Sequence, residues 1–401
     1  MELASRFLDI YTLMLVAVWA AAVWAWVLRR AAPGAEQLLF IGLALLLMVF
    51  SATRYQTGYD WPAYEEFYVQ GDNLSGKYEF EPGFRWLVEL FRYWRLDFTT
   101  FQFVLSAAQV LFTALFIRKF FQGLALLALA VYYTVPDLYL INAFSLMRQG
   151  LALSLFLCGV VYFFERKPWL TCLFFASAML FHISSAFAIG VFLVIRCIGV
   201  SPMVAVPVVG ALAASYLANI NILGGLIQLA ATWPPLQKYA IYQGLDTPSA
   251  SILYKLLFVT LFLTLFYLAC YRRRMQLREG EYTQARAFNF ALACAAVSIS
   301  LVFWAYPTFL SRFQAFFIFF LLGYTWPVFD FSKSLNRGLL CCVIFGVCTA
   351  LYAKFVLTHI SMVYFPYQSL FQRNIELRST GSERVDELHK ELQRLWRGAD
   401  E

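Results

Sequence analysis

The stretch Gln37–Thr53, QLLFIGLALLLMVFSAT, is a run of 17 residues without a charged side chain. A helix gains about 1.5 Å per residue, so a run of this length comes close to crossing the roughly 30 Å of hydrocarbon in a bilayer. Comparable runs recur along most of the chain. We predict spans at 8–28, 37–53, 98–117, 122–141, 147–164, 202–222, 252–271, 287–304, 312–329 and 338–357. The sequence therefore predicts an all-α polytopic membrane protein.

The composition supports this class. Of the 401 residues, 61% are hydrophobic and only 14% are charged, whereas soluble proteins carry about 25% charged residues. A water-soluble globular enzyme is therefore excluded, and the basic residues are too scattered to form a nucleic-acid surface. The run at 8–28 is too long for the core of a signal peptide, so we expect it to be retained. All eight cysteines lie in or beside apolar runs, which predicts neither a disulfide nor a metal site.

The basic residues orient the spans. Fourteen Lys and Arg lie in the short loops between spans, which predicts that these loops are cytoplasmic. Lys167 and Arg196 then lie on the same side with only 28 residues between them, so an even number of crossings must fit there. We predict two half-length helices, 168–181 and 184–196, that meet in a break near His182; a single long span is the alternative. The chain then has about 10–12 transmembrane helical segments, with both termini outside.

Most of the hydrophilic residues fall on the predicted outer side. We predict extracytoplasmic loops at 54–97 and 224–250. Within the first loop, apolar and charged residues from Phe84 to Arg95 recur with the spacing of a helix that lies in the membrane interface. Residues 1–371 are predicted to form a single integral membrane domain. They are followed by an amphipathic tail, 372–401, whose helix is predicted to begin at Ser382.

Several ionisable side chains lie within or beside spans, where they are costly unless they meet a partner or water, and they are therefore functional candidates. They are Arg54, Asp60, Glu79, Glu81, Arg148, His182 and Arg312, and all map to the predicted outer side. Arginines among acids suit a site for a phosphate-bearing substrate. Plainer alternatives are that the arginines contact headgroups, that Asp60 caps a turn and that His182 is a satisfied core histidine.

Short motifs around these residues carry a family resemblance. They are Gly58-Tyr59-Asp60-Trp61 with Tyr64, Glu81-Pro82-Gly83-Phe84, Arg148-Gln149-Gly150-Leu151-Ala152, Phe181-His182-Ile183-Ser184-Ser185-Ala186, Ser311-Arg312-Phe313 and Pro366-Tyr367. In their order and spacing from about residue 50 to 370, the sequence resembles the EpsG/Wzy-like family of membrane polysaccharide polymerases.

The resemblance implies a glycosyltransferase-C-like membrane fold and an enzyme that needs neither metal nor cofactor. Such an enzyme joins oligosaccharide repeat units of an O-antigen or exopolysaccharide that are carried on undecaprenyl pyrophosphate. It would act in the bacterial cytoplasmic (inner) membrane, with the active site facing the periplasm or outside. The expected partners are undecaprenyl-pyrophosphate-linked oligosaccharides and membrane lipid, with a flippase and a chain-length regulator as further candidates. Nucleic acid is not among them.

The resemblance also distributes roles among the candidates. Arg148 and Arg312 are assigned to the pyrophosphate, whose charge grows as the glycosidic bond breaks, with Arg54 a weaker third. The acceptor hydroxyl needs a base, for which we rank Asp60 first, then His182, then Glu81. Gln149, Tyr59, Trp61 and Tyr64 are predicted to contact substrate, although these aromatic residues equally suit an interfacial belt.

Three other classes stay open at this point. A lipid-linked oligosaccharide flippase or other transporter would carry polar groups through the bilayer midplane and in related halves, which is not the pattern here. An acyltransferase built on His182 would leave the outer arginines unexplained. A ligase that moves a finished glycan from the same lipid to a different acceptor would use the same residues as a polymerase.

Overall fold

The computed structural model describes residues 6–28, 34–71, 79–121, 123–225, 252–281, 283–328, 334–371 and 379–397. Within these ranges the chain is predominantly helical, and the β pairing found there is an isolated antiparallel bridge between Arg54 and Ser369. The prediction of an all-α polytopic membrane protein is confirmed. The predicted loop at 224–250 lies almost wholly outside the described residues.

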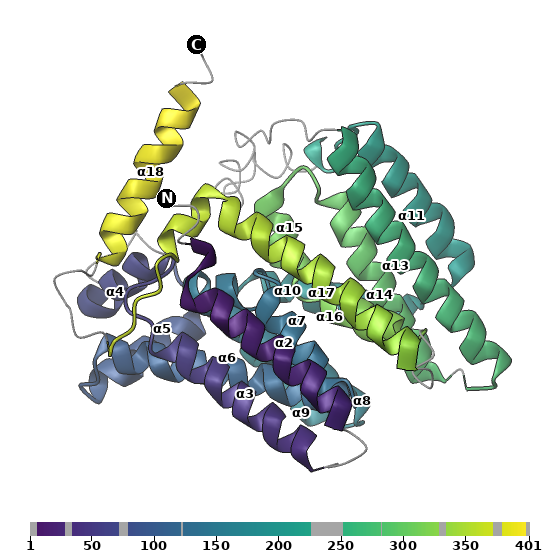
Figure 1. The fold of residues 1–401 in the computed structure, drawn as a ribbon, viewed down its shortest axis with the longest axis horizontal. Coiled ribbons are helices and arrows are strands. Elements are labelled where there is room, and N and C mark those ends of the chain that lie inside the picture. Colours follow the sequence, from purple (N-terminus) through teal and green to yellow (C-terminus); the bar gives the residue numbers. More distant parts are fainter. Residues whose placement is uncertain are drawn as a thin grey trace. The chain divides into compact units, whose positions relative to one another are not determined.

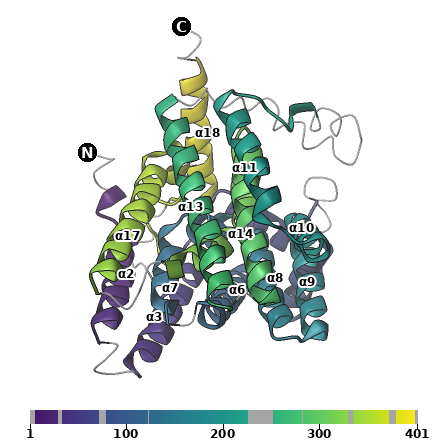
Figure 2. The same cartoon turned by 90° about the vertical axis from the view of Figure 1, so that its right-hand side faces the viewer.

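The chain divides into two compact units, Met1–Ser185 with Gly338–Glu401, and Ala186–Arg337. The first contains α2 (Ile10–Leu28), α3 (Ala35–Ala52), α4 (Trp61–Gln70), α5 (Pro82–Tyr93), α6 (Phe98–Phe120), α7 (Ala125–Thr134), the π-helix η2 (Ile141–Ser145), α8 (Met147–Phe164), α9 (Pro168–Phe181), the 3-10 helix η5 (His359–Val363) and α18 (Gly381–Arg397). Figure 1 shows α2 beside α3, and Figure 2 shows α8 beside α9. The prediction of one integrated membrane domain stays a prediction.

The second unit is built from apolar helices. It contains α11 (Pro202–Leu217), α13 (Ile252–Arg278), α14 (Gln284–Val302), α15 (Pro307–Gln314), α16 (Ile318–Thr325) and the 3-10 helix η4 (Trp326–Val328). Helices α11, α13 and α14 lie side by side (Figure 2). Two helices, α10 (Ser184–Ile198) and α17 (Ser334–Leu357), have residues in both units.

Five described helices are long and apolar enough to cross a membrane. They are α3, α6, α8, α13 and α14, and each coincides with a predicted span. Helices α15 and α16 qualify together as a sixth, although they are bent by 56° at their junction. The remaining apolar helices, such as α9 and α10, are shorter. The predicted break near His182 is present, because α9 ends at Phe181 and α10 begins at Ser184.

Two predicted spans are wrong as continuous helices. The run at 122–141 contains α7 only as far as Thr134, because Pro136 has no N–H to donate and disfavours helical backbone in the residue before it. The run at 312–329 is divided between α15 and α16. Arg312 therefore lies inside α15, which begins at Pro307, rather than at the start of a single long span.

A polar stripe on α6 organises the first unit. Its members are Gln102, Ser106, Gln109 and Thr113, all at most 2% exposed and spaced so that they share one face of the helix. The Gln102 amide donates to the carbonyl oxygen of Arg54 at 2.9 Å and its oxygen accepts from the Trp61 indole at 2.6 Å. The Arg54 guanidinium, which is fully buried, donates from Nη1 to Ser106 Oγ at 2.9 Å. The start of the 54–97 loop is thereby fastened to the helix core.

The C-terminal tail contains the predicted helix, α18, which begins at Gly381, one residue before the predicted start at Ser382. Thr380 and Glu383 cap it reciprocally: Glu383 N donates to Thr380 Oγ1 at 3.2 Å and Thr380 N donates to Glu383 Oε2 at 2.7 Å. The buried face runs through Gly381, Arg384 and Leu388, whereas Leu392 is 36% exposed. The helix contacts η5 and α4, and Figure 1 shows its first turns beside α4.

Gly58 gives a direct test of how closely the first loop approaches the core. We expect Gly58→Ala to lower the free energy of unfolding by about 2 kcal/mol or more. Its φ is +120°, and an added Cβ would overlap the carbonyl group of Phe144. The measurement is the thermal unfolding midpoint of purified protein in detergent. Gly42→Ala is the control, because a Cβ there meets nothing within 4 Å; equal midpoints for the two variants would contradict the packing described.

Candidate functional site

Three helix ends meet in the first unit and carry the candidate residues. Glu81 precedes α5 in an extended conformation (φ −64°, ψ 151°), and Pro82 then starts the helix in the position where its missing N–H is harmless. Arg148 is the second residue of α8. His182 follows the last residue of α9, and its extended backbone (φ −157°, ψ 131°) ends that helix.

A glycine allows two of these ends to meet. A Cβ on Gly83 would lie 2.7 Å from the carbonyl oxygen of Leu180 and 2.8 Å from its Cβ, closer than real side chains approach. The first turn of α5 can therefore rest directly on the last turn of α9. This contact brings Glu81 to His182.

Glu81 is the centre of the cluster. Its Oε2 pairs with Arg148 Nη1, and its Oε1 accepts from the backbone N–H of Ile183 at 3.2 Å. The same oxygen lies 3.6 Å from His182 Nδ1. The side chains of Glu81 and Arg148 are each 16% exposed, so the pair is largely shielded yet still reachable.

Aromatic rings surround the Arg148 guanidinium. Its central carbon lies 4.4 Å from the ring centre of Phe80, 5.6 Å from that of Tyr64 and 5.8 Å from that of Phe84. These distances are those of cation–π contacts. Arg148 Nε also donates to the Tyr64 hydroxyl at 3.5 Å. Burial raises the pKa of Tyr64 to about 12 although the Arg148 cation opposes the rise, so the phenol keeps its proton at neutral pH.

His182 is held in a defined orientation and is 7% exposed. Its Nδ1 accepts from the backbone N–H of Ser184 at 3.2 Å, and the Ser184 hydroxyl lies 3.3 Å away. An Nδ1 that accepts carries no proton in the neutral ring, so the proton is then on Nε2.

The remaining residues predicted from the first loop lie in different settings. Asp60 stands at the start of α4 without capping it, and its charge acts on the pKa of Tyr64 in the site. Tyr59 donates its backbone N–H to Ser145 Oγ at 2.8 Å, and its hydroxyl meets His389 Nε2 at 2.9 Å. Trp61 is buried against Gln102.

Three other predicted contact residues lie in settings of their own. Arg54 is enclosed by protein and donates to the carbonyl oxygens of Ser51 and Thr57 and to Ser106, which is a structural setting. Gln149, beside Arg148, is 1% exposed in the packed face of α8. Arg312 belongs to α15 of the second unit. The substrate roles of all three stay predictions.

Sequence reasoning did not identify every contributor to the cluster. Phe80 and Phe84 flank the arginine, and the backbone N–H of Ile183 binds the carboxylate. Nor did it note the inward-facing polar stripe on α6. The spacing of that stripe, four, three and four residues within an apolar run, indicates one polar face of a helix and could have identified it.

The cluster can bind an anion and accept a proton. The N-termini of α5 and α8 both lie at it, and helix N-termini favour negative charge, as does the Arg148 fork. A carboxylate beside an imidazole provides groups for proton transfer. Among the described residues no group of three or more His, Cys, Asp or Glu could hold a metal ion.

A sequence model described as the EpsG family matches residues 37–369, which is more than half of the chain. Glu81, Arg148 and His182 all lie within the matched residues. No curated protein and no solved structure is similar enough to this chain to be matched.

The pairing of Glu81 with Arg148 can be tested by a double-mutant cycle. We expect Arg148→Met and Glu81→Gln each to destabilise the protein, and their combination to cost less than the two added, with a coupling of about 1–3 kcal/mol. Each single change leaves its partner without the ion pair in a shielded site. Thermal unfolding in detergent provides the measurement.

A matched control pair lies elsewhere in the same unit. Lys119 and Glu165 also form an ion pair, but their side chains are 38% and 30% exposed. Their coupling should stay below about 1 kcal/mol. Equal couplings for the two pairs would show that the Glu81–Arg148 pair is not shielded as described.

Proposed function

The chain belongs to the EpsG family, and from this membership and the geometry of the site we propose that it is a metal-independent, lipid-dependent polysaccharide polymerase. In this proposal it transfers a glycan from undecaprenyl pyrophosphate onto a lipid-linked oligosaccharide repeat unit, on the outer side of the cytoplasmic membrane. The observation that carries the proposal is the cluster of Glu81, Arg148 and His182 at three helix ends. It combines an anion-binding group with a proton acceptor.

Arg148 is proposed to bind the lipid pyrophosphate. As the bond between the anomeric carbon and the phosphate oxygen breaks, negative charge grows on the leaving group, and a guanidinium fork beside two helix N-termini stabilises it. The rings of Phe80 and Tyr64 hold the guanidinium in place, and Glu81 pairs with its Nη1 until phosphate oxygens replace that carboxylate. This arrangement supplies positive charge from the chain itself.

Glu81 is proposed to take the acceptor proton. Without substrate its carboxylate is neutralised by Arg148. When phosphate oxygens occupy the arginine, the carboxylate loses that partner and becomes a stronger proton acceptor. The acceptor hydroxyl then attacks the anomeric carbon, its proton moves to Glu81, and the lipid pyrophosphate leaves. His182 lies beside the carboxylate, with its Nδ1 3.6 Å from Glu81 Oε1.

Asp60, ranked first from the sequence, remains a candidate base beside Glu81, and substitution distinguishes the two. We expect purified protein in nanodiscs, given lipid-linked repeat units of its own pathway and EDTA, to produce a ladder of polymer on a gel. Glu81→Gln should lower kcat by about 10²- to 10⁴-fold because proton transfer is lost. Asp60→Asn and His182→Asn are compared in the same assay, and a larger loss in Asp60→Asn would assign the base to Asp60.

Glu165→Gln is the control for that assay, because it alters an acid that pairs with Lys119 and Lys167 away from the cluster. It should leave the ladder intact. A missing ladder for the unaltered protein, together with transbilayer movement of the same lipid in liposomes, would replace the polymerase with a flippase.

Phosphate recognition by Arg148 predicts that lysine cannot replace it. Arg148→Lys should lower kcat/KM at least about tenfold, because a point charge does not reproduce two parallel hydrogen bonds to phosphate. Arg118→Lys is the matched control, since Arg118 is an exposed residue in the last turn of α6. Arg312→Lys in the same series tests the role predicted for that residue. Full turnover in Arg148→Lys would remove Arg148 from phosphate binding.

A further inference from the structure

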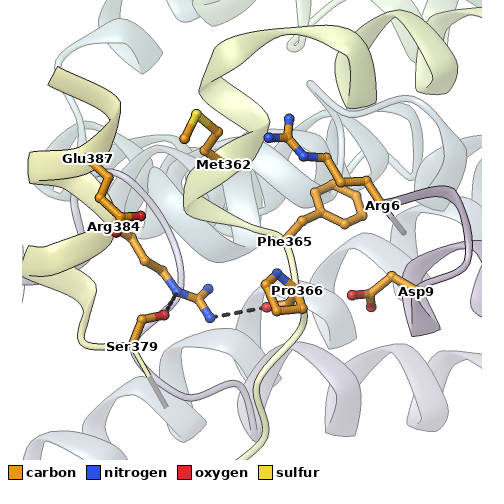
Figure 3. Close-up of a pocket in the computed structure, with 8 residues that line it drawn as sticks. All are labelled: Arg6, Asp9, Met362, Phe365, Pro366, Ser379, Arg384 and Glu387. Carbon is orange, nitrogen blue, oxygen red and sulfur yellow. Dashed lines mark hydrogen bonds between the residues drawn. The ribbon is translucent and has the colours of Figure 1, made fainter. Parts of the chain in front are cut away.

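A polar cavity lies in the first unit, between α18 and the segment that follows η5. Its volume is about 230 Å³ and its lining includes Arg6, Asp9, Phe365, Pro366, Arg384 and Glu387. Figure 3 shows Arg384 and Glu387 on α18 at one side, Arg6 and Asp9 from the N-terminal segment at the other, and Phe365 with Pro366 between them. The proposed polymerase reaction uses none of these residues.

The charges in the lining are balanced. Two arginines face two carboxylates, with an aromatic ring and a proline beside them. An anion would be repelled by Asp9 and Glu387, and a lipid chain would cover the exposed Glu387 carboxylate without giving it a hydrogen-bond donor. A hydroxyl-rich ligand, by contrast, can donate to the Glu387 carboxylate, accept from the Arg6 guanidinium and pack its C–H groups on the Phe365 ring. This is the chemistry of a sugar.

The cavity has a fixed wall and an available acceptor. Arg384 is 3% exposed and is already engaged: its Nε donates to Ser379 Oγ at 2.7 Å and its Nη2 to the carbonyl oxygen of Pro366 at 3.1 Å (Figure 3). It therefore holds the wall together. Glu387 lies one turn further along α18, is exposed and makes no hydrogen bond with the described residues. Its carboxylate is free to receive hydroxyl groups.

The cavity is joined to the site through one short segment. Arg384 Nη1 donates to Thr57 Oγ1 at 3.4 Å, and Gly381 N donates to Gln56 Oε1 at 2.9 Å. Asp60 follows three residues after Thr57, and Tyr64 in the Arg148 cluster follows on α4. A glycan bound in the cavity would therefore contact Arg384, which hydrogen-bonds to the segment that leads to the candidate site.

The cavity also lies largely outside the family match, which ends at residue 369 and begins at residue 37. Arg6, Asp9, Arg384 and Glu387 all fall beyond these limits. The reaction proposed above is argued from residues inside the matched segment. These four residues therefore lie outside the part of the chain that family membership accounts for.

We propose that this cavity is a saccharide subsite, which binds a sugar ring of the substrate glycan away from the bond that reacts. The proposal rests on the proposed function, because it assigns the ligand to the same glycan. The volume is below the roughly 300–1,000 Å³ of sites for drug-sized ligands, so the cavity takes one ring rather than a whole repeat unit.

The test measures binding without catalysis. The probes are lipid-free oligosaccharides of one and two repeat units, released by mild acid from the lipid-linked intermediates of the producing cells. Their dissociation constants for the protein in nanodiscs are measured by saturation-transfer NMR. Glu387→Gln and Arg6→Gln should each weaken binding by about five- to tenfold. The neighbouring exposed acid provides the control, Asp386→Asn, which should leave binding unchanged.

The outcomes separate this proposal from the polymerase itself. Binding that is absent, or unaffected by Glu387→Gln and Arg6→Gln while the polymer ladder persists, would overturn the subsite and leave the polymerase standing. Binding that depends on both residues in a protein that makes no ladder would support the subsite and remove the polymerase. Displacement of the oligosaccharide by inorganic pyrophosphate would show an anion site instead and would also overturn the proposal.

Discussion

The ion pair between Glu81 and Arg148 is the contact on which the arrangement of the first unit depends. A cation at the start of an apolar helix costs several kcal/mol unless a partner meets it. That partner comes from the start of α5, and α5 can reach it only because Gly83 lets the helix rest on the end of α9. The same approach places the backbone N–H of Ile183 and the His182 ring at the carboxylate. One electrostatic requirement thus joins three helices and creates the site.

Arg54 and Arg148 show why residue type alone does not define a role. Both are arginines next to apolar runs, and both are shielded. Arg54 donates to carbonyl and hydroxyl oxygens of its own surroundings, which spread its charge over neutral acceptors and fasten the loop to α6. Arg148 is neutralised instead by a single carboxylate that a competing anion can displace. The second arrangement is exchangeable, which is what substrate binding requires.

The apolar runs located most helices because the membrane imposes length and hydropathy on each span, as at α6 and α14. Length and hydropathy alone do not reveal the interruption of the helix at Pro136. They also miss α4, because this ten-residue helix contains polar residues and is too short to span a membrane. The site was predicted only as a set of residues. Glu81 and His182 are about 100 residues apart in the sequence. The spacing of residues within one segment does not indicate which acidic residue will pair with Arg148. Partner choice comes from packing between helices, which a single sequence does not display.

The segment from Gln56 to Asp60 makes the charged tail part of the site rather than an appendage. On one side Tyr59 donates its N–H to Ser145, three residues before Arg148, and Gly58 is pressed against the backbone beside it. On the other side α18 holds the segment through Arg384, Gly381 and the contact of His389 with Tyr59. The segment therefore contacts both α18 and the residues that precede α8. Because Asp60 and α4 continue directly from it, the position of the tail helix and the geometry around Arg148 are set together.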